Sequence, residues 1–360
     1  MHELEKKWLK EAVQATAKIN GSLSWQSPSN IALVKYWGKH GNQLPNNPSI
    51  SFTLHESRTE TSLHYSMPEN REHSLSFFFE GKVNEAFGNK IEKFLFGIKP
   101  FFPFLGQIQL KIDSQNTFPH SSGIASSASA MSALVMGILA LEQKFSHQPI
   151  DLKKASWFSR LASGSAARSV FPQAALWGKT AALEESADHF AIPLQSHLHP
   201  VFTNYYDSIL ITDAAEKTVS SRAGHALMEK NPYAKARYQT ANNNTIALLN
   251  ALRKGDLELF IQITESEALQ LHALMMSSHQ PYLLMKANSL NLINAIWNFR
   301  QDTKIPVCFT LDAGPNIHLL YPEKDRKNVF DFIQNELINW CQDGKWIDDK
   351  VGFGPSPLQV

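Results

Sequence analysis

One stretch of the chain, from Asn116 to Ala130, combines a single glycine with many small side chains and leads into an apolar helical run, Met131 to Leu141. Small side chains leave backbone N–H groups unobstructed, and the following helix adds unpaired N–H donors and the positive end of its dipole. The stretch could therefore bind a polyanion, with the hydroxyls of Ser126, Ser127 and Ser129 as donors or as ligands of a nucleotide-bound magnesium ion. Its spacing matches neither the P-loop nor the dinucleotide fingerprint, so taken alone it favours a capped helix after a serine-rich turn.

A second loop of small residues, 163–169, contains Ser163, Ser165 and Arg168. Two hydroxyls and a guanidinium suit a carboxylate or a diphosphate, because the arginine fork can bind two oxygens at once. The alternative is that Arg168 forms a structural ion pair.

Two further segments end in polar residues at the close of an apolar strand, where sites usually lie. Lys35, Tyr36 and Lys39 follow the first strand, and the alternative is that both lysines are solvated ends while Trp37 is part of the core. Asp312 follows the second strand and precedes Gly-Pro, so by itself it could merely initiate a turn.

Four motifs in this order resemble the diphosphomevalonate decarboxylase family of the GHMP kinase superfamily, and together they span roughly residues 29 to 321. They are Asn-Ile-Ala-Leu-x-Lys-Tyr-Trp-Gly-Lys with Leu-Pro-x-Asn-x-Ser-Ile-Ser-x-Thr-Leu (residues 30–39 and 44–54), the loop at 118–130, the loop at 163–169, and Asp-Ala-Gly-Pro-Asn (312–316). Residues 218–224 also resemble the family's Ser-Ser-x-x-Gly element.

The resemblance implies a role for each motif. Asp312 would be the catalytic acid residue, with Arg168 near the substrate carboxylate and Lys35 also in the catalytic set. The substrate, and above all its phosphates, would be held by Tyr36, Lys39, Ser163, Ser165, Ser221 and Arg222. ATP would be held by Pro119, Ser122, Gly123, Ala125, Ser126, Ser127 and Ser129, with Mg²⁺ carried by ATP and Ser127 as a candidate ligand.

The reaction implied is ATP-dependent decarboxylation of mevalonate 5-diphosphate to isopentenyl diphosphate, ADP, phosphate and CO₂, in isoprenoid biosynthesis. One alternative is a sister enzyme acting on mevalonate or its monophosphate, such as a 3-kinase that stops before decarboxylation. Lys39 and Arg222, which have a second phosphate to bind, favour the diphosphate. Another alternative is a catalytically silent ligand-binding paralogue, against which Asp312 and Arg168 argue. The sequence leaves open whether Asp312 removes a proton or only orients and stabilises.

Several positions depart from the family pattern. Ala162 and Ala167 stand where the family commonly has other residues, and Phe-Pro-Gln (171–173) replaces Phe-Gly-Gly, which predicts a stiffer backbone after the arginine loop. His225 stands where methionine is common. Glu265 and Glu267 replace a familiar Asp-Ser-Asn stretch, and two extra acids near a diphosphate are expected to repel it.

The pattern of apolar residues predicts the elements that must position these groups. Helices are expected at 3–18, 82–98, 131–141, 152–161, 243–254, 257–276, 289–302 and 326–342. Strands are expected at 22–25, 29–39, 49–54, 58–65, 75–79, 107–112, 206–212, 307–311 and 317–321. This order is that of an α+β protein. The resemblance implies a GHMP kinase fold, with an N-terminal ribosomal S5 domain 2-like domain (1–200, ATP-binding), a C-terminal ferredoxin-like domain (201–360), and the active site between them.

Length and composition limit the remaining possibilities. A chain of 360 residues predicts two domains, and 43% hydrophobic residues argue against disorder. The formal net charge of +1 argues against a dedicated nucleic-acid binder. The two cysteines match no metal or disulfide spacing. With neither a signal peptide core nor a membrane-length apolar run, the expected protein is soluble and cytoplasmic, without a membrane partner. A homodimer is expected from the resemblance, although the sequence itself leaves the oligomeric state open.

Overall fold

The computed structural model describes residues 1–15, 19–67, 75–119, 124–214 and 221–358, and within them two β-sheets carry the architecture. The larger sheet has the strand order β14-β1-β4-β7-β5-β6, and β8 and β9 extend it from β4. The smaller sheet has the order β11-β12-β10-β13. A two-stranded ribbon, β2 with β3, lies outside both sheets.

The strands of the larger sheet are β1 (Asn20–Ala32), β4 (Ser49–Ser66), β5 (Leu75–Phe79), β6 (Lys82–Val83), β7 (Gln109–Asn116), β8 (Ala174–Trp177), β9 (Ala191–Pro193) and β14 (Ser356–Leu358). Those of the smaller sheet are β10 (Tyr205–Leu210), β11 (Cys308–Thr310), β12 (Ile317–Pro322) and β13 (Trp346–Lys350), and the ribbon pairs β2 (Lys39–His40) with β3 (Leu44–Pro45). The α-helices are α1 (Glu3–Lys10), α2 (Glu85–Ile98), α3 (Ser126–Ser146), α4 (Leu152–Ala162), α5 (Ser221–Leu227), α6 (Ala234–Lys254), α7 (Leu257–Met276), α8 (Ala287–Thr303) and α9 (Arg326–Asn335).

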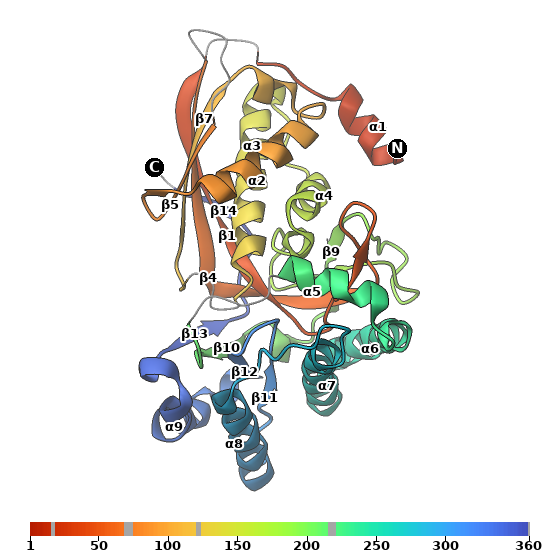
Figure 1. The fold of residues 1–360 in the computed structure, drawn as a ribbon, viewed down its shortest axis with the longest axis vertical. Coiled ribbons are helices and arrows are strands. Elements are labelled where there is room, and N and C mark those ends of the chain that lie inside the picture. Colours follow the sequence, from red (N-terminus) through yellow and green to blue (C-terminus); the bar gives the residue numbers. More distant parts are fainter. Residues whose placement is uncertain (16–18, 68–74, 120–123, 215–220, 359–360) are drawn as a thin grey trace.

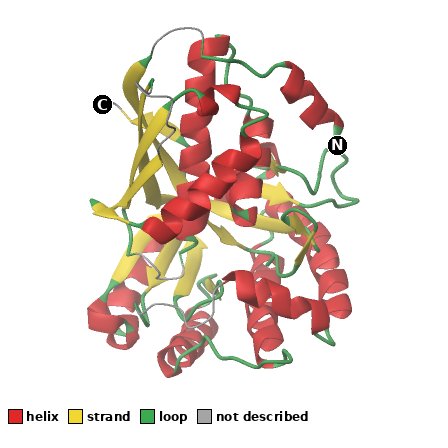
Figure 2. Ribbon diagram, turned by 45° about the horizontal axis from the view of Figure 1, so that its top comes forward, coloured by secondary structure: helices red, strands yellow, loops and turns green. Residues whose placement is uncertain are grey.

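The helices cover the sheets in layers (Figures 1 and 2). The long helix α3 packs along β1 and β4, with α2 and α4 beside it. Helices α7 and α8 pack on β11, and α9 packs on β12. Twelve residues of α3 are buried, as expected for a helix that lies in the middle of the protein rather than on its surface.

Several expected elements have different limits in the structure. The prediction of two strands, at 22–25 and 29–39, is wrong. A single strand, β1, covers both regions and ends at Ala32, with a register shift between Pro28 and Asn30. The strands expected at 49–54 and 58–65 are one strand, β4, which changes partners along its length: it pairs with β8 at one end and with β7 at the other. Local alternation cannot reveal a strand that changes partners, because each half has its own buried face.

Helix limits also differ from the predictions. The first helix ends at Lys10 instead of continuing to residue 18, and the last ends at Asn335 instead of 342. Glu336, with φ −126° and ψ −57°, interrupts the last helix before a 3₁₀ turn, Leu337–Trp340. Helix α6 begins at Ala234, nine positions before the expected start. The expected helix at 82–98 is preceded by a two-residue strand, β6.

The end of the chain returns to the larger sheet, where Ser356 pairs with Gln26 of β1. Just before this point, the carboxylate of Asp349 on β13 accepts hydrogen bonds from the backbone N–H groups of His55, Glu56 and Ser57 in β4, each at 2.8 Å. Asp349 is fully buried. A single side chain of the smaller sheet therefore satisfies three backbone donors of the larger one, at the part of β4 between its two pairing regions.

We expect Asp349→Ala to lower the free energy of unfolding by about 3 kcal/mol or more, because three backbone donors would lose their acceptor. Urea denaturation measures this loss. Asp348→Ala is the matched control: its carboxylate pairs with Arg326 at the surface, and an exposed pair is worth about 0–1 kcal/mol. Equal effects of the two substitutions would contradict a linking role for Asp349.

Candidate active site

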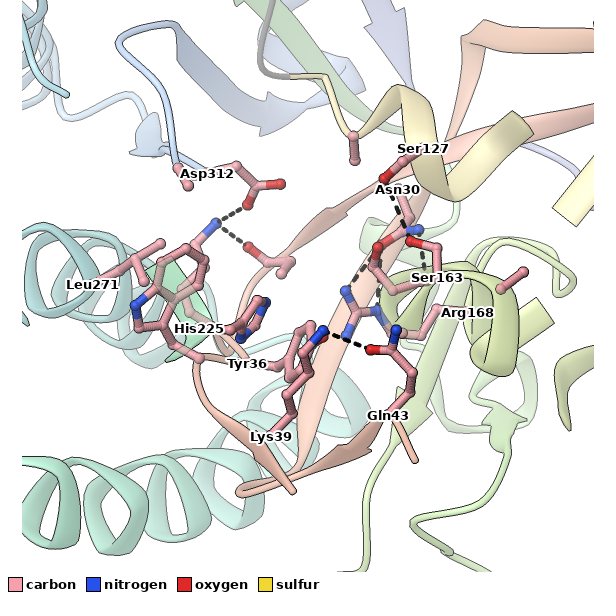
Figure 3. Close-up of a pocket in the computed structure, with 18 of the residues that line it drawn as sticks. Asn30, Tyr36, Lys39, Gln43, Ser127, Ser163, Arg168, His225, Leu271 and Asp312 are labelled. Atoms are coloured by element: carbon pink, nitrogen blue, oxygen red, sulfur yellow. Dashed lines mark hydrogen bonds and ion pairs between the residues drawn. The ribbon is translucent and has the colours of Figure 1, made fainter. Parts of the chain in front are cut away.

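One pocket gathers residues from the segments singled out in the sequence (Figure 3). Its walls come from the end of β1 and the ribbon that follows, α2, the start of α3, the loop at 162–168, α5, α7 and the loop after β11. The predicted site residues that line it are Lys35, Tyr36, Lys39, Ala125, Ser127, Ser163, Ser165, Arg168 and Asp312. The structure thus brings together groups from four separated segments of the chain.

Lys35 and Asp312 form an ion pair in this pocket. The Lys35 ammonium lies 2.9 Å from Asp312 Oδ1 and also donates to the carbonyl of Ala32. Lys35 is 1% exposed, so the alternative of a solvated strand end is wrong for it. Burial lowers the pKa of Lys35, and the nearby Asp312 carboxylate opposes that shift. The carboxylate of Asp312 faces the pocket, so this residue does more than initiate a turn.

The backbone of Lys35 is held by a second, buried ion pair. Glu267 on α7 accepts from the Lys35 N–H at 2.8 Å, and Arg237 on α6 donates to the Lys35 carbonyl at 3.0 Å. Both terminal guanidinium nitrogens of Arg237 donate to the two carboxylate oxygens of Glu267, and the two side chains are 3% and 0% exposed. Asn47 donates to the same carbonyl. Both polar backbone groups of Lys35 are therefore fixed, which limits where its side chain can reach.

Arg168 lies on the opposite wall from Asp312 (Figure 3). It is 2% exposed, and its guanidinium donates to Asn30 Oδ1 at 3.1 and 3.3 Å and to Ser49 Oγ at 2.7 Å. It forms no ion pair with another of the described residues, so the alternative of a structural ion pair is not supported. Burial lowers the pKa of Arg168 to about 10, which still leaves it charged near neutral pH. A buried cation with only neutral partners is a site for an anion.

Tyr36 forms the floor between the arginine and the ribbon. Its ring packs edge-on against Trp177, with ring centroids 4.8 Å apart, and at a tilt against His225, with centroids 4.4 Å apart. Burial raises the pKa of its hydroxyl. A Cβ at position 164 would come within 2.5 Å of the Tyr36 hydroxyl, so the glycine of the 163–169 loop is what lets the tyrosine approach. Lys39 donates to Gln43 at 2.7 Å at the same end of the pocket.

The loop predicted to hold ATP is described in part. Helix α3 begins at Ser126, after Ala125 in the left-handed conformation at φ 41°, and Ala125 and Ser127 line the pocket. Ser127 lies 3.4 Å from Ser163, hydroxyl to hydroxyl. The first turn of a 21-residue helix therefore opens onto the pocket, an arrangement that suits a polyphosphate.

Not every residue predicted to bind ATP lines the pocket. Ser129 is fully buried and bonds to Thr59 at 2.6 Å, so the expectation that its hydroxyl faces the nucleotide is not supported. Two positions along the helix from Ser127, Ser129 lies on the other side of the helix and faces the sheet instead of the pocket. Ser126 and Pro119 do not line the pocket, whereas Ser122 and Gly123 lie outside the described residues.

The side chains of Ser221 and Arg222, for which phosphate contacts were predicted, lie outside the described part of the chain. Their backbone forms the start of α5.

The expectation that Glu265 and Glu267 repel a diphosphate is wrong. Glu267 is neutralised by Arg237, as described above. Glu265 binds Arg300 at 2.6 Å and Trp297 at 2.9 Å, and neither glutamate lines the pocket.

Sequence reasoning assigned no supporting role to four residues that hold the site in place. Arg237 and Glu267 hold Lys35, Asn30 orients Arg168, and His272 bonds to the Asp312 carbonyl at 3.1 Å. Asn30 gave a usable signal, because an amide in an otherwise apolar strand needs a partner. Glu267 stood out only as a departure from the family pattern, and nothing in the sequence pairs it with Arg237, 30 positions away on another helix.

The described residues contain no group of three or more His, Cys, Asp or Glu side chains that could hold a metal ion. Both cysteines are free and buried. No helix within the described ranges is both long and apolar enough to cross a bilayer.

Two family models match the chain: the diphosphomevalonate decarboxylase-like N-terminal domain over residues 27–189, and the mevalonate 5-diphosphate decarboxylase C-terminal domain over residues 208–350. The diphosphomevalonate decarboxylase of Gibberella zeae is 30% identical over 317 residues, which cover 84% of this chain and 81% of that protein.

Solved structures are similar over nearly the whole chain. Mevalonate diphosphate decarboxylase from Staphylococcus aureus has a TM-score of 0.81 at 25% identity, covering 95% of this chain and 99% of that one. A complex of MDDEF with MVAPP, AMPPCP and magnesium has a TM-score of 0.79 at 25% identity, covering 95% and 100%. These similarities confirm the expected α+β fold of the GHMP kinase type.

We expect Glu267→Ala to lower the free energy of unfolding by about 3–5 kcal/mol, because Arg237 would be left buried without a counter-charge. Chemical denaturation measures the loss. Glu265→Ala on the same helix is the control, and it should lose less than half as much, since the side chain of its partner Arg300 is 26% exposed. Similar losses for the two variants would argue against a special role for the buried pair.

Proposed function

We infer how the pocket works from the premise that the chain belongs to the diphosphomevalonate decarboxylase family. The protein is an ATP-dependent decarboxylase that converts mevalonate 5-diphosphate to isopentenyl diphosphate, ADP, phosphate and CO₂ in the mevalonate pathway. Two groups on opposite walls of one pocket carry the proposed roles. One is the carboxylate of Asp312, which a buried lysine holds, and the other is Arg168, a buried arginine with only neutral partners.

We assign the substrate carboxylate to Arg168. Its guanidinium is buried and charged, and Asn30 and Ser49 hold its plane without neutralising it. A carboxylate can take two parallel hydrogen bonds from such a fork. The substrate would then be oriented with its tertiary alcohol toward Asp312, on the opposite wall.

Asp312 would accept the proton of the tertiary alcohol while that oxygen attacks the γ-phosphoryl group of ATP. Lys35 forms an ion pair with Asp312 at 2.9 Å and fixes the carboxylate in position. The P–O bond to ADP breaks and the tertiary phosphate ester forms.

The second half of the reaction removes the new phosphate group. As the C–O bond breaks, positive character develops at the tertiary carbon, and the electron pair of the bond to the carboxylate forms the alkene as CO₂ leaves. Arg168 orients the carboxylate, and its neutral partners remain in place when the negative charge departs.

We place the phosphates of ATP at the first turn of α3, with Ala125, Ser127 and the preceding segment from Pro119 through Ser122 and Gly123, and Ser126 nearby. Magnesium, when bound with ATP, would neutralise phosphate charge, and Ser127, a hydroxyl on the pocket wall in the first turn of α3, could bind it. The diphosphate of the substrate is assigned to Tyr36, Lys39, Ser163, Ser165, Ser221 and Arg222.

Division into domains at 1–200 and 201–360, a homodimeric assembly and a cytoplasmic location are also proposed. Sedimentation of the purified chain tests the assembly.

The activity is tested by incubating the protein with ATP, Mg²⁺ and, separately, mevalonate, its 5-phosphate and its 5-diphosphate, while ADP and CO₂ are followed independently. We expect equal amounts of both products from the diphosphate, with a kcat/KM that exceeds the monophosphate value by orders of magnitude, because remote phosphates help position the reacting end. ADP without CO₂ would indicate a kinase, and a better monophosphate substrate would replace the named one.

Asp312→Asn should keep the fold at a lower free energy of unfolding, because buried Lys35 loses its counter-charge. It should lose about 10²–10⁴-fold in kcat, because the amide cannot accept the proton of the alcohol. The KM for the substrate should change little, since Arg168 and the phosphate contacts remain. ADP release at a near wild-type rate would remove Asp312 from the catalytic role.

A further inference from the structure

His225 on α5 lies between two aromatic rings at the edge of the pocket. Its imidazole packs 4.4 Å from the ring centroid of Tyr36 and 4.4 Å from that of Trp37, and its Nδ1 accepts the backbone N–H of Gly38 at 2.9 Å. The side chain is 7% exposed and lines the pocket. These contacts fix the plane of the ring (Figure 3).

The contact with Gly38 also fixes which nitrogen carries the proton. A backbone N–H can only donate, so Nδ1 must be the acceptor, and in the neutral ring the proton is then on Nε2. Burial and the nearby charge of Lys39 lower the pKa of His225 to about 3, so the ring is neutral near neutral pH. Among the described residues no group accepts a hydrogen bond from Nε2, and the His225 side chain lines the pocket. The Nε2–H group is therefore available to a ligand bound in the pocket.

The position of the ring indicates which part of the substrate it meets. Asp312 and Arg168 are assigned to the reacting end, whereas His225 lies beside Tyr36 and near Lys39, at the end assigned to the phosphates. A phosphate oxygen is an acceptor without a proton, so it matches an N–H donor. A methionine, common at this position in the family, has no proton to donate.

We propose that the Nε2–H of His225 donates a hydrogen bond to a diphosphate oxygen of the substrate, and that His225 is a specificity-determining residue of this pocket. The proposal rests on the proposed function and adds to it an uncharged donor among cationic groups. Such a donor favours a phosphorylated substrate without adding charge to a pocket that already holds Lys35, Lys39 and Arg168.

Two substitutions test the roles of the two ring nitrogens separately. In His225→Asn, the amide oxygen can take the place of Nδ1 and accept from Gly38, but no group reaches the position of Nε2. In His225→Gln, the longer side chain can present an N–H near the position of Nε2, but the acceptor for Gly38 is displaced. The first variant removes the pocket donor, and the second weakens the structural contact.

The KM and Kd for mevalonate 5-diphosphate, the KM for ATP and the melting temperature are measured for both variants. We expect His225→Asn to raise the KM and Kd for the diphosphate about tenfold or more, because a hydrogen bond to a charged group is lost. Its melting temperature and KM for ATP should stay close to wild type. His225→Gln should keep a KM within about threefold of wild type but melt at a lower temperature, because a buried N–H loses its partner.

The reverse pattern, with normal affinity in His225→Asn and weak affinity in His225→Gln, would assign His225 a purely structural role and overturn the proposal. An unchanged diphosphate affinity in both variants would also overturn it. Failure of the proposed function is distinguishable, because it would appear in the wild-type protein as a lack of turnover with mevalonate 5-diphosphate.

Discussion

The site depends on the ion pair between a buried lysine, Lys35, and Asp312. Lys35 has almost no exposure, and moving an ammonium out of water is costly unless it is paired and hydrogen-bonded. Its counter-charge, Asp312, follows β11 of the smaller sheet, whereas Lys35 follows β1 of the larger one. The ion pair therefore forms only when the two sheets are correctly placed, and the same contact positions the proposed catalytic carboxylate. Folding and the chemistry of the pocket share this interaction.

Other buried charges divide into two groups with opposite consequences. Arg237 and Glu267 neutralise each other and support the backbone of Lys35, so they act as rigid structure. Arg168 is equally buried but is bonded to an amide and a hydroxyl, so its charge remains available to a ligand. A fully paired guanidinium would have to give up its partner before it could bind a substrate carboxylate. Neutral partners orient the group without that cost.

Local patterns predicted much of the framework. The strand at 75–79 and the helix at 257–276 have the limits expected from their apolar spacing, because each buries one face against the rest of the protein. Predictions were wrong where a pairing partner decides the outcome. Strand β4 continues through His55, Glu56 and Ser57 because Asp349, almost 300 positions away, satisfies their backbone donors. No local signal marks such a partner.

The chemical types at the site can be read from the amino-acid sequence: two lysines, an arginine, an aspartate and a serine-rich helix start, in a family order that indicates phosphoryl transfer and decarboxylation. Tertiary structure alone decided the charge state and direction of each group. Lys35 is buried instead of solvated, Ser129 faces the sheet, Glu267 is neutralised by Arg237, and His225 presents Nε2–H because Gly38 occupies Nδ1. The physical reason is that burial and hydrogen-bond partners come from segments far apart in the chain, whereas residue type and spacing are local.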